Sequence, residues 1–258
     1  MKPRLEVFLR YRYLLQDLIV KDIKVKYRRS VLGLLWSILN PLFMMLVITA
    51  VFERIFKIRV ENFPIYYLTG SSIFNFFSEG TQLAMGSVFG ASSLIKKVYI
   101  PKYIFPLEKV MFAFVNYMFS LVAVIIMFAV LRFSVPWTVF LFIIPSIYVL
   151  VFSIGFGLIL SAMSVFFRDI VHLYSVLVVA WQYLTPIMYS YDSLPAAMQL
   201  FMCFNPMYYF VLYFRDVTMY GIVPGLDVNI ACMAFALCSL LAGLLVFKKK
   251  QDKFILFI

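Results

Sequence analysis

The sequence predicts an all-α membrane protein with six transmembrane helices. The chain of 258 residues is 64% hydrophobic and only 14% charged, and its mean hydropathy is +0.97. Of its six long apolar stretches, Gly33–Phe52, Val110–Leu131 and Val228–Phe247 contain no charged residue. A helix of about 20 residues crosses the hydrocarbon core of a bilayer, which is about 30 Å thick. We therefore expect a single domain, built around a six-span bundle over residues 33–247.

The segment before the first span, residues 1–32, is predicted to form an amphipathic helix at the membrane surface. Its apolar residues recur at steps of three and four, and charged residues occupy the other face. The apolar set is Phe8, Tyr11, Leu15, Leu18, Ile19 and Ile23, and the opposite set is Arg10, Asp17, Lys21 and Lys24. A basic amphipathic helix binds along a bilayer without crossing it. No small-residue cleavage pattern follows the first span, so we expect it to be retained.

The second apolar stretch, Phe63–Ile95, is too long for one upright span and contains a single charge, Glu79. Its four glycines indicate a helix that tilts, bends or packs closely on a neighbour. The basic segment Leu94–Pro106 follows, and its two prolines argue against a continuous helix. The fourth span is expected within Phe133–Phe167, and the fifth from about Ile170 to Tyr191.

A shorter apolar stretch, Gln199–Phe214, lies between the fifth and sixth spans. It is divided at Asn205-Pro206 and bracketed by charges at Asp192, Arg215 and Asp216. A stretch of this length is more often re-entrant or interfacial than membrane-spanning. We therefore expect re-entrant helices here, which leaves six spans and places both termini on the same side.

The distribution of basic residues predicts the orientation of the bundle. With six spans, most of the 23 Lys and Arg residues lie on the side of the two termini, including those of the tail, residues 248–258. The other side receives Arg54, Lys57, Arg59, Arg132 and Arg215. Cytoplasmic loops carry the excess of basic residues, so both termini are expected inside, in a multi-pass protein of the cytoplasmic membrane. This bias accounts for the net charge of +11 without a nucleic-acid partner.

The residues that several kinds of chemistry require are missing. No Gly-x-x-x-x-Gly-Lys loop is present, so a nucleotide would have to bind to another chain. The three cysteines lack metal-ligand spacing and His172 is the single histidine, so neither a metal site nor catalytic residues are expected. Ion-coupled carriers need ionisable groups inside the membrane, and only Glu79 qualifies. The sequence thus indicates a transport protein that receives energy from a cytoplasmic partner.

Five segments of the chain form a recognisable series. They are Lys21–Pro41, Leu94–Pro106, Val165–Ile170, Thr185–Ile187 and Asn205-Pro206. In their order and spacing they resemble the permeases of polysaccharide and teichoic-acid ABC exporters. These are type-2 ABC transporter membrane subunits, found in exporters of O-antigen, rhamnan and wall teichoic acid. The similarity covers essentially the whole chain.

This resemblance implies a homodimer of six-helix subunits with two copies of a separate ATPase subunit, which binds ATP and Mg. It also implies a glycan substrate carried on undecaprenyl diphosphate, and no cofactor in this chain. In that family the N-terminal helix and the loop between spans two and three dock on the ATPase. Here these would be residues 4–23 and Leu94–Ile104. The stretch before the last span forms two short outer gate helices, here within Leu194–Tyr220.

The resemblance also implies a set of ATPase-docking residues. They are Leu94, Lys96, Lys97, Tyr99, Lys102, Arg168 and Asp169. For the three lysines, the alternative is a solvated loop that fixes the orientation of the chain. For Arg168 and Asp169, the alternative is a local ion pair that caps a helix end.

The basic residues at the end of the N-terminal segment are a candidate site for the lipid diphosphate. They are Lys21, Lys24, Lys26, Arg28 and Arg29. Arg and Lys side chains suit that anion. The alternative is an orientation signal attracted to anionic lipid, which explains the charge by itself.

Aromatic and polar side chains within the spans are candidates for the lining of a channel. The set is Trp36, Asn40, Phe74, Trp181, Tyr183 and Tyr189. An aromatic ring offers a sugar a flat apolar face with a polar rim. For each residue taken singly, packing in the core is the favoured alternative.

Two other functions are compatible with a chain of this composition. An ion-coupled secondary transporter of a small solute would depend on Glu79 and would work without an ATPase. A membrane enzyme of lipid-sugar metabolism would turn over a lipid substrate without ATP. Transport by the isolated chain in liposomes would contradict an ATP-driven exporter.

Overall fold

The computed structural model describes residues 4–28, 30–56 and 60–257, and every regular element in these ranges is a helix. The all-α prediction is therefore confirmed. The longer helices are α1 (Arg4–Tyr27), α2 (Trp36–Thr49), α3 (Phe63–Gly90), α5 (Ile104–Val130), α6 (Ile143–Phe166), α7 (Ile170–Leu184) and α10 (Leu226–Lys250). The shorter ones are α4 (Ser92–Lys97), α8 (Ala196–Met202) and α9 (Pro206–Arg215). Turns of 3-10 helix occupy Gly33–Leu35, Trp137–Phe142, Tyr191–Ser193 and Gln251–Leu256, and π-helical turns occupy Ala50–Ile55 and Asp216–Tyr220.

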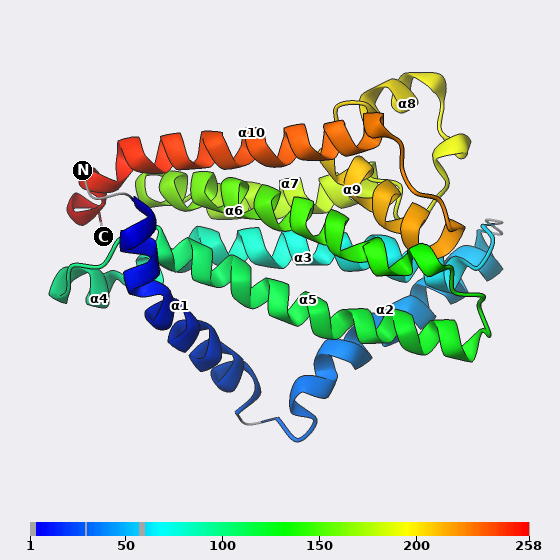
Figure 1. The fold of residues 1–258 in the computed structure, drawn as a ribbon, viewed down its shortest axis with the longest axis horizontal. Coiled ribbons are helices and arrows are strands. Elements are labelled where there is room, and N and C mark those ends of the chain that lie inside the picture. Colours follow the sequence, from blue (N-terminus) through cyan, green and yellow to red (C-terminus); the bar gives the residue numbers. More distant parts are fainter. Residues whose placement is uncertain (1–3, 29, 57–59, 258) are drawn as a thin grey trace.

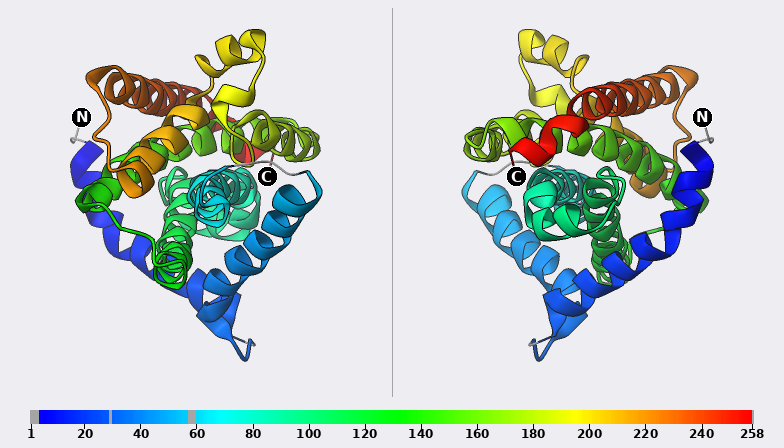
Figure 2. Two further views of the ribbon diagram at one scale, coloured as in Figure 1. Left: turned by 90° about the vertical axis from the view of Figure 1, so that its right-hand side faces the viewer. Right: turned by 90° about the vertical axis from the view of Figure 1, so that its left-hand side faces the viewer.

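Helix α3 runs through the centre of the molecule, and the other long helices surround it (Figure 2). It packs mainly against α5 and α6 and is buried along most of its length. Helices α1 and α4 gather with both ends of the described chain at one end of the bundle, here called the inner end (Figure 1). Helix α8 lies toward the opposite, outer end (Figure 1). The segments predicted to meet an ATPase thus share one end of the bundle.

Four helical segments in the described residues are long and apolar enough to cross a membrane. They are Gly33–Glu53, Ile104–Val130, Trp137–Phe166 and Leu226–Leu256. They coincide with the predicted first, third, fourth and sixth spans. Helix α3 has 28 residues, but it carries many polar side chains. A helix that other helices enclose can carry polar side chains that hydrocarbon would exclude.

The predicted fifth span is too long. Helix α7 ends at Leu184 and has 15 residues, whereas the apolar pattern continues to Tyr191. The cause is Pro186, which has no amide hydrogen and disfavours a helical conformation in the residue before it. Thr185 accordingly adopts an extended backbone, with φ −94° and ψ 134°. The second apolar stretch is also divided, because α3 ends at Gly90 and the short helix α4 follows.

Helices α6 and α10 approach closely where small residues face each other. A Cβ atom added at Gly155 would lie 2.3 Å from the carbonyl carbon of Ser239. One added at Gly243 would lie 2.3 Å from the carbonyl oxygen of Gly155. Helices inside a membrane associate through such close backbone contact, because lipid tails already satisfy apolar side chains.

A leucine at position 155 should therefore separate α6 from α10. We expect Gly155→Leu to destabilise the protein by about 3 kcal/mol or more, since the neighbouring backbone cannot move aside. The measurement is the thermal unfolding midpoint of the purified chain in detergent. Gly86→Leu is the matched control, because a Cβ atom there meets no atom within 4 Å. An equal loss of stability in both variants would contradict this interpretation.

Candidate functional site

A polar groove of about 860 Å³ opens along one side of α3. Its walls come from the end of α1, from α2, α3 and α5, and from one residue of α7, Gln182. Most of the lining side chains are uncharged hydrogen-bonding groups. They include Tyr27, Ser37, Asn40, Tyr67, Ser71, Ser72, Asn75, Ser78, Gln82, Asn116, Tyr117, Ser120 and Gln182. Such a concentration of polar groups beside a membrane-spanning bundle indicates a function rather than packing.

The polar stripe on α3 follows from its sequence. Tyr67, Ser71, Asn75, Ser78 and Gln82 succeed one another at steps of three and four, so they share one face of the helix. On its other sides α3 is buried against apolar and aromatic side chains of the core. The helix therefore presents its polar face to the groove and its apolar surface to α5 and α6.

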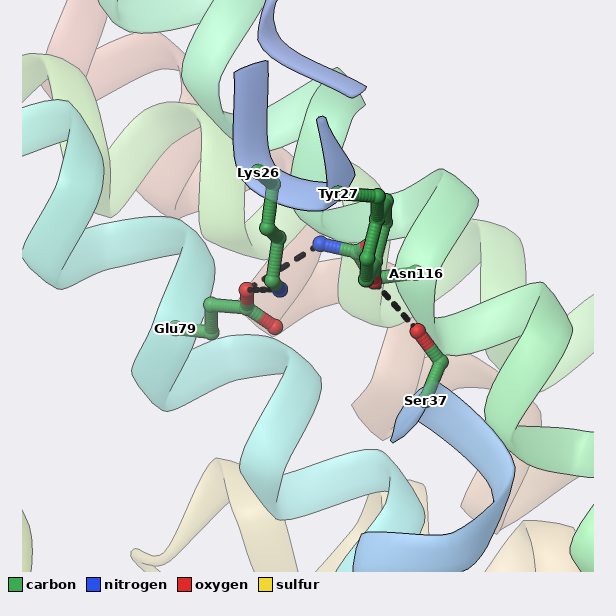
Figure 3. A network of polar contacts seen from close by, with 5 residues as sticks. All are labelled: Lys26, Tyr27, Ser37, Glu79 and Asn116. Carbon is green, nitrogen blue, oxygen red and sulfur yellow. Dashed lines mark hydrogen bonds and ion pairs between the residues drawn. The ribbon is translucent and has the colours of Figure 1, made fainter. Parts of the chain in front are cut away.

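An ion pair lies in the groove where α1 meets α3. The Lys26 ammonium is 2.9 Å from Glu79 Oε1, which also accepts a hydrogen bond of 3.1 Å from Asn116 Nδ2. The Tyr27 hydroxyl donates to Asn116 Oδ1 at 3.3 Å and bonds closely to the Ser37 hydroxyl. Figure 3 shows these five side chains, contributed by α1, α2, α3 and α5. We call them the inner network.

A second polar cluster ties α1 to α5. The Lys109 ammonium bonds to the Asp22 carboxylate and lies 3.4 Å from Glu108 Oε2. Glu108 is buried, and its other carboxylate oxygen has no hydrogen-bond partner among the described residues. The Lys109 ammonium therefore interacts with two carboxylates, that of Asp22 on α1 and that of Glu108 on α5.

At the outer end, Arg215 is buried without a carboxylate partner in the described part of the chain. Its side chain is 4% exposed and donates to the carbonyl oxygens of Pro186, Tyr66 and Ile187 at 2.7, 2.9 and 3.1 Å. Its guanidinium carbon lies 3.4 Å from the centre of the Tyr66 ring, in a cation–π contact. Gly70 leaves the space that this guanidinium occupies. Arg215 therefore binds α9 to α3 and to the segment after α7.

Asn205 explains the Asn-Pro motif that divides the last apolar stretch. Its side-chain oxygen accepts from the Met207 amide at 3.1 Å and from Trp181 Nε1 at 2.8 Å. Its side-chain nitrogen donates to the Thr185 hydroxyl at 3.2 Å. Asn205 is thus the N-cap of α9, and Pro206 occupies the first helical position, where no amide hydrogen is needed. The motif starts α9 and fixes it to α7.

The predicted docking residues differ in what they contact. Lys96 and Lys97 are exposed at the end of α4, and Tyr99 is 93% exposed. Leu94 packs against the apolar cluster at the inner end. Lys102 instead donates to the carbonyl oxygen of Gln251 at 2.6 Å, and burial lowers the pKa of its ammonium. The ammonium of Lys102 is therefore occupied within the chain.

The alternative explanation for Arg168 and Asp169 is wrong. Both side chains are exposed, and they form no ion pair with each other within the described structure. Asp169 stands at the N-cap position of α7 without a side-chain capping bond. The Arg168 guanidinium instead lies 5.3 Å from the centre of the Phe89 ring. Their role in docking stays a prediction.

The predicted lipid-diphosphate cluster is split by the structure. Lys21, Lys24 and Arg28 are exposed on α1 and at its end, and Lys26 joins the inner network. Arg29 lies outside the described residues. The cluster therefore contributes one cation to the groove and leaves the other three described ones at the surface.

Two of the six predicted channel residues, Trp36 and Asn40, line the groove. Phe74 is buried in the core, and Trp181 packs edge-on against Phe77 and Phe156. Tyr183 is exposed, and Tyr189 donates to its carbonyl oxygen at 2.8 Å. The sequence analysis did not predict the polar lining residues of α3 and α5. The periodic spacing of Ser, Asn and Gln on α3 could have indicated that this helix has a polar face.

A family model for ABC-2 type transporters matches residues 13–219, which is most of the chain. The chain belongs to the ABC-2 type transporter family. As a member, it is a transport component with several apolar membrane helices, and not an enzyme.

Several curated proteins are similar to this ABC-2 chain over nearly their whole length. The O-antigen export system permease protein RfbA of Klebsiella pneumoniae is 28% identical over 94% of this chain and 95% of its own. RfbA of Myxococcus xanthus is 27% identical over 95% of each chain. The polysialic acid transport protein KpsM of Escherichia coli is 23% identical over 92% of this chain and 93% of its own.

The Arg215 contacts give a test of the outer end of this ABC-2 chain. A Cβ atom at Gly70 would lie 2.4 Å from Arg215 Nη2, so Gly70→Ala must displace a guanidinium that is bonded to three carbonyls. We expect a loss of about 1–3 kcal/mol of stability. Thermal unfolding in detergent measures it, with Gly90→Ala as the control because that site is open. Equal midpoints for the two variants would show that Arg215 is not held as described.

Proposed function

We propose that this chain is the membrane subunit of an ABC exporter that moves a lipid-linked polysaccharide or teichoic acid across the cytoplasmic membrane. The polymer would be carried on undecaprenyl diphosphate. The single observation that carries the proposal is the groove along α3, lined by Ser, Asn, Gln and Tyr side chains. These groups exchange hydrogen bonds with the hydroxyls of a glycan as it passes. The relatives RfbA, an O-antigen export permease, and KpsM, a polysialic acid transport protein, support this substrate class.

The proposed topology has six spans, with both termini in the cytoplasm. The four long apolar segments supply four spans, and α3 and α7 supply the other two. The exposed lysines of α4 and the lysines at the end of α10 support a cytoplasmic inner end. In this orientation α8 and α9 face outward and form the two re-entrant gate helices.

We further propose that two copies of the chain enclose the path. The groove is open on one side, and the two helices that border it, α2 and α7, expose apolar side chains. The exposed set includes Phe43, Met44, Leu46, Val47, Val176, Leu177 and Val179. A second copy seated on these helices would convert an open groove into a channel with walls from both subunits.

The energy would come from two ATPase subunits at the inner end, which bind ATP and Mg. Lys96, Lys97 and Tyr99 project from the inner end and are exposed, as an ATPase-docking surface requires. ATP binding would draw these segments together, and rigid-body movement of the spans would open the path. An ion-coupled carrier has less support, because Glu79 is bonded to Lys26 and Asn116 instead of being a free carboxylate.

Reconstitution tests the whole proposal. The chain is placed in liposomes with and without its proposed ATPase subunit, and transfer of an undecaprenyl-diphosphate-linked glycan to the far leaflet is measured. We expect transfer only when the ATPase and ATP are both present. An ATPase variant that cannot hydrolyse ATP is the control. Transfer by the chain alone, driven by an ion gradient, would contradict an exporter of this kind.

Charge reversal tests the docking surface. We expect Lys96→Glu/Lys97→Glu to reduce copurification of the ATPase, and ATP-dependent transfer with it, by about tenfold, because each reversal replaces attraction by repulsion. Lys248→Glu/Lys249→Glu is the matched control, since both lysines are exposed at the end of α10. Unchanged assembly and export in the first variant would remove these lysines from the interface.

A further inference from the structure

The described lining of the groove contains only two charged side chains, Lys26 and Glu79. The two side chains form an ion pair of 2.9 Å, and their opposite charges sum to zero. The described lining therefore offers hydrogen-bonding groups and no net charge. Such a lining suits the uncharged hydroxyls of a sugar chain. It offers a phosphate group a single described cation, and a carboxylate already occupies that cation.

This ion pair is open to the groove. The Lys26 and Glu79 side chains are 41% and 36% exposed, so a ligand that enters can reach the ammonium. Half-exposed ion pairs add little to stability, because water screens them. A diphosphate, taken as a whole, carries more negative charge than one carboxylate and presents more acceptor oxygens. It can therefore displace Glu79 from Lys26.

Glu79 would keep a partner if Lys26 left. Asn116 Nδ2 donates to the same carboxylate oxygen at 3.1 Å. Asn116 is in turn held by the Tyr27 hydroxyl, which also bonds to Ser37 at the start of α2. After the exchange the Glu79 carboxylate has no cationic partner among the described residues, but it keeps the hydrogen bond from Asn116 and its exposure to water, and α1 stays attached to α5 through Asp22 and Lys109.

We propose that Glu79 is a specificity-determining residue that occupies Lys26 until the diphosphate of a lipid-linked substrate replaces it. This inference rests on the proposed function and assigns that substrate a residue-level contact. Anions that bind the Lys26 ammonium more weakly than Glu79 does would not displace this carboxylate, whereas a diphosphate would. Replacement would also release the last turn of α1 from α3. Binding in the groove would then change how α1 is held against the bundle.

The test measures binding of undecaprenyl diphosphate to the full chain with its ATPase in phosphatidylcholine nanodiscs. We expect Lys26→Gln to weaken binding about tenfold and Glu79→Gln to tighten it by at least about threefold, because it removes the competing carboxylate. In Lys26→Gln/Glu79→Gln, the benefit of losing Glu79 should be greatly reduced. A purely structural role for the pair predicts weaker or unchanged binding in Glu79→Gln.

Control variants and control ligands identify the cause. Glu61→Gln and Lys253→Gln make the same charge changes at exposed positions outside the groove and should leave the affinity unchanged. Phosphatidylglycerol in the nanodisc and inorganic pyrophosphate in solution replace the probe in parallel. The double variant removes both charges together and reports whether the fold tolerates their loss, by size-exclusion profile and helical circular dichroism.

Three outcomes would overturn the inference. They are no tightening in folded Glu79→Gln, an equal response to phosphatidylglycerol or pyrophosphate, and no binding of the probe by the unaltered complex. ATP-dependent glycan transfer is measured separately. If transfer occurs and Glu79→Gln binds no tighter, the exchange is wrong and the proposed function stands. If transfer fails, the proposed function is wrong regardless of the binding data.

Discussion

Polar side chains within a membrane need a partner or water, because hydrocarbon offers no hydrogen bonds. Helix α3 carries such side chains along one face and lies at the centre of the bundle. Its apolar surface is satisfied by α5 and α6, so the polar stripe has to face a hollow in the protein. The groove is the consequence of that one helix, and the positions of α1, α2 and α7 define its edges.

The middle and the outer end of α3 are held by different chemistry. Near the middle, Glu79 takes part in exposed polar contacts with two other helices, which an entering ligand can exchange. At the outer end, the Tyr66 carbonyl and ring hold Arg215, which is enclosed and bonded to three carbonyls. Breaking the outer contact would leave a buried cation without partners, which is far more costly. The contacts of Glu79 are therefore the ones that can be exchanged.

Apolar length and hydropathy predict the long apolar helices, because a bilayer sets both. They do not identify α3 as a central helix of the bundle. Its polar stripe lowers its hydropathy, and the neighbouring helices that bury it cannot be read from its own sequence. The length of α7 was overestimated because Pro186 ends the helix before the apolar pattern ends. For the groove, Trp36 and Asn40 were predicted as an aromatic and a polar side chain of the first span, whereas the contact between Asn116 and Glu79 joins two helices that are distant in the sequence. The spacing of residues in the sequence predicts which side chains are neighbours on one helix. It does not predict which side chains of two different helices meet.

The tight crossing of α6 and α10 limits how the protein can change shape. Their backbones touch at Gly155 and Gly243, so one helix cannot slide or turn against the other without collision. These two helices therefore move as one unit. By contrast, α2 has few buried residues within the described chain. In the proposed exporter, movement between helices would therefore be confined to the helices outside this pair.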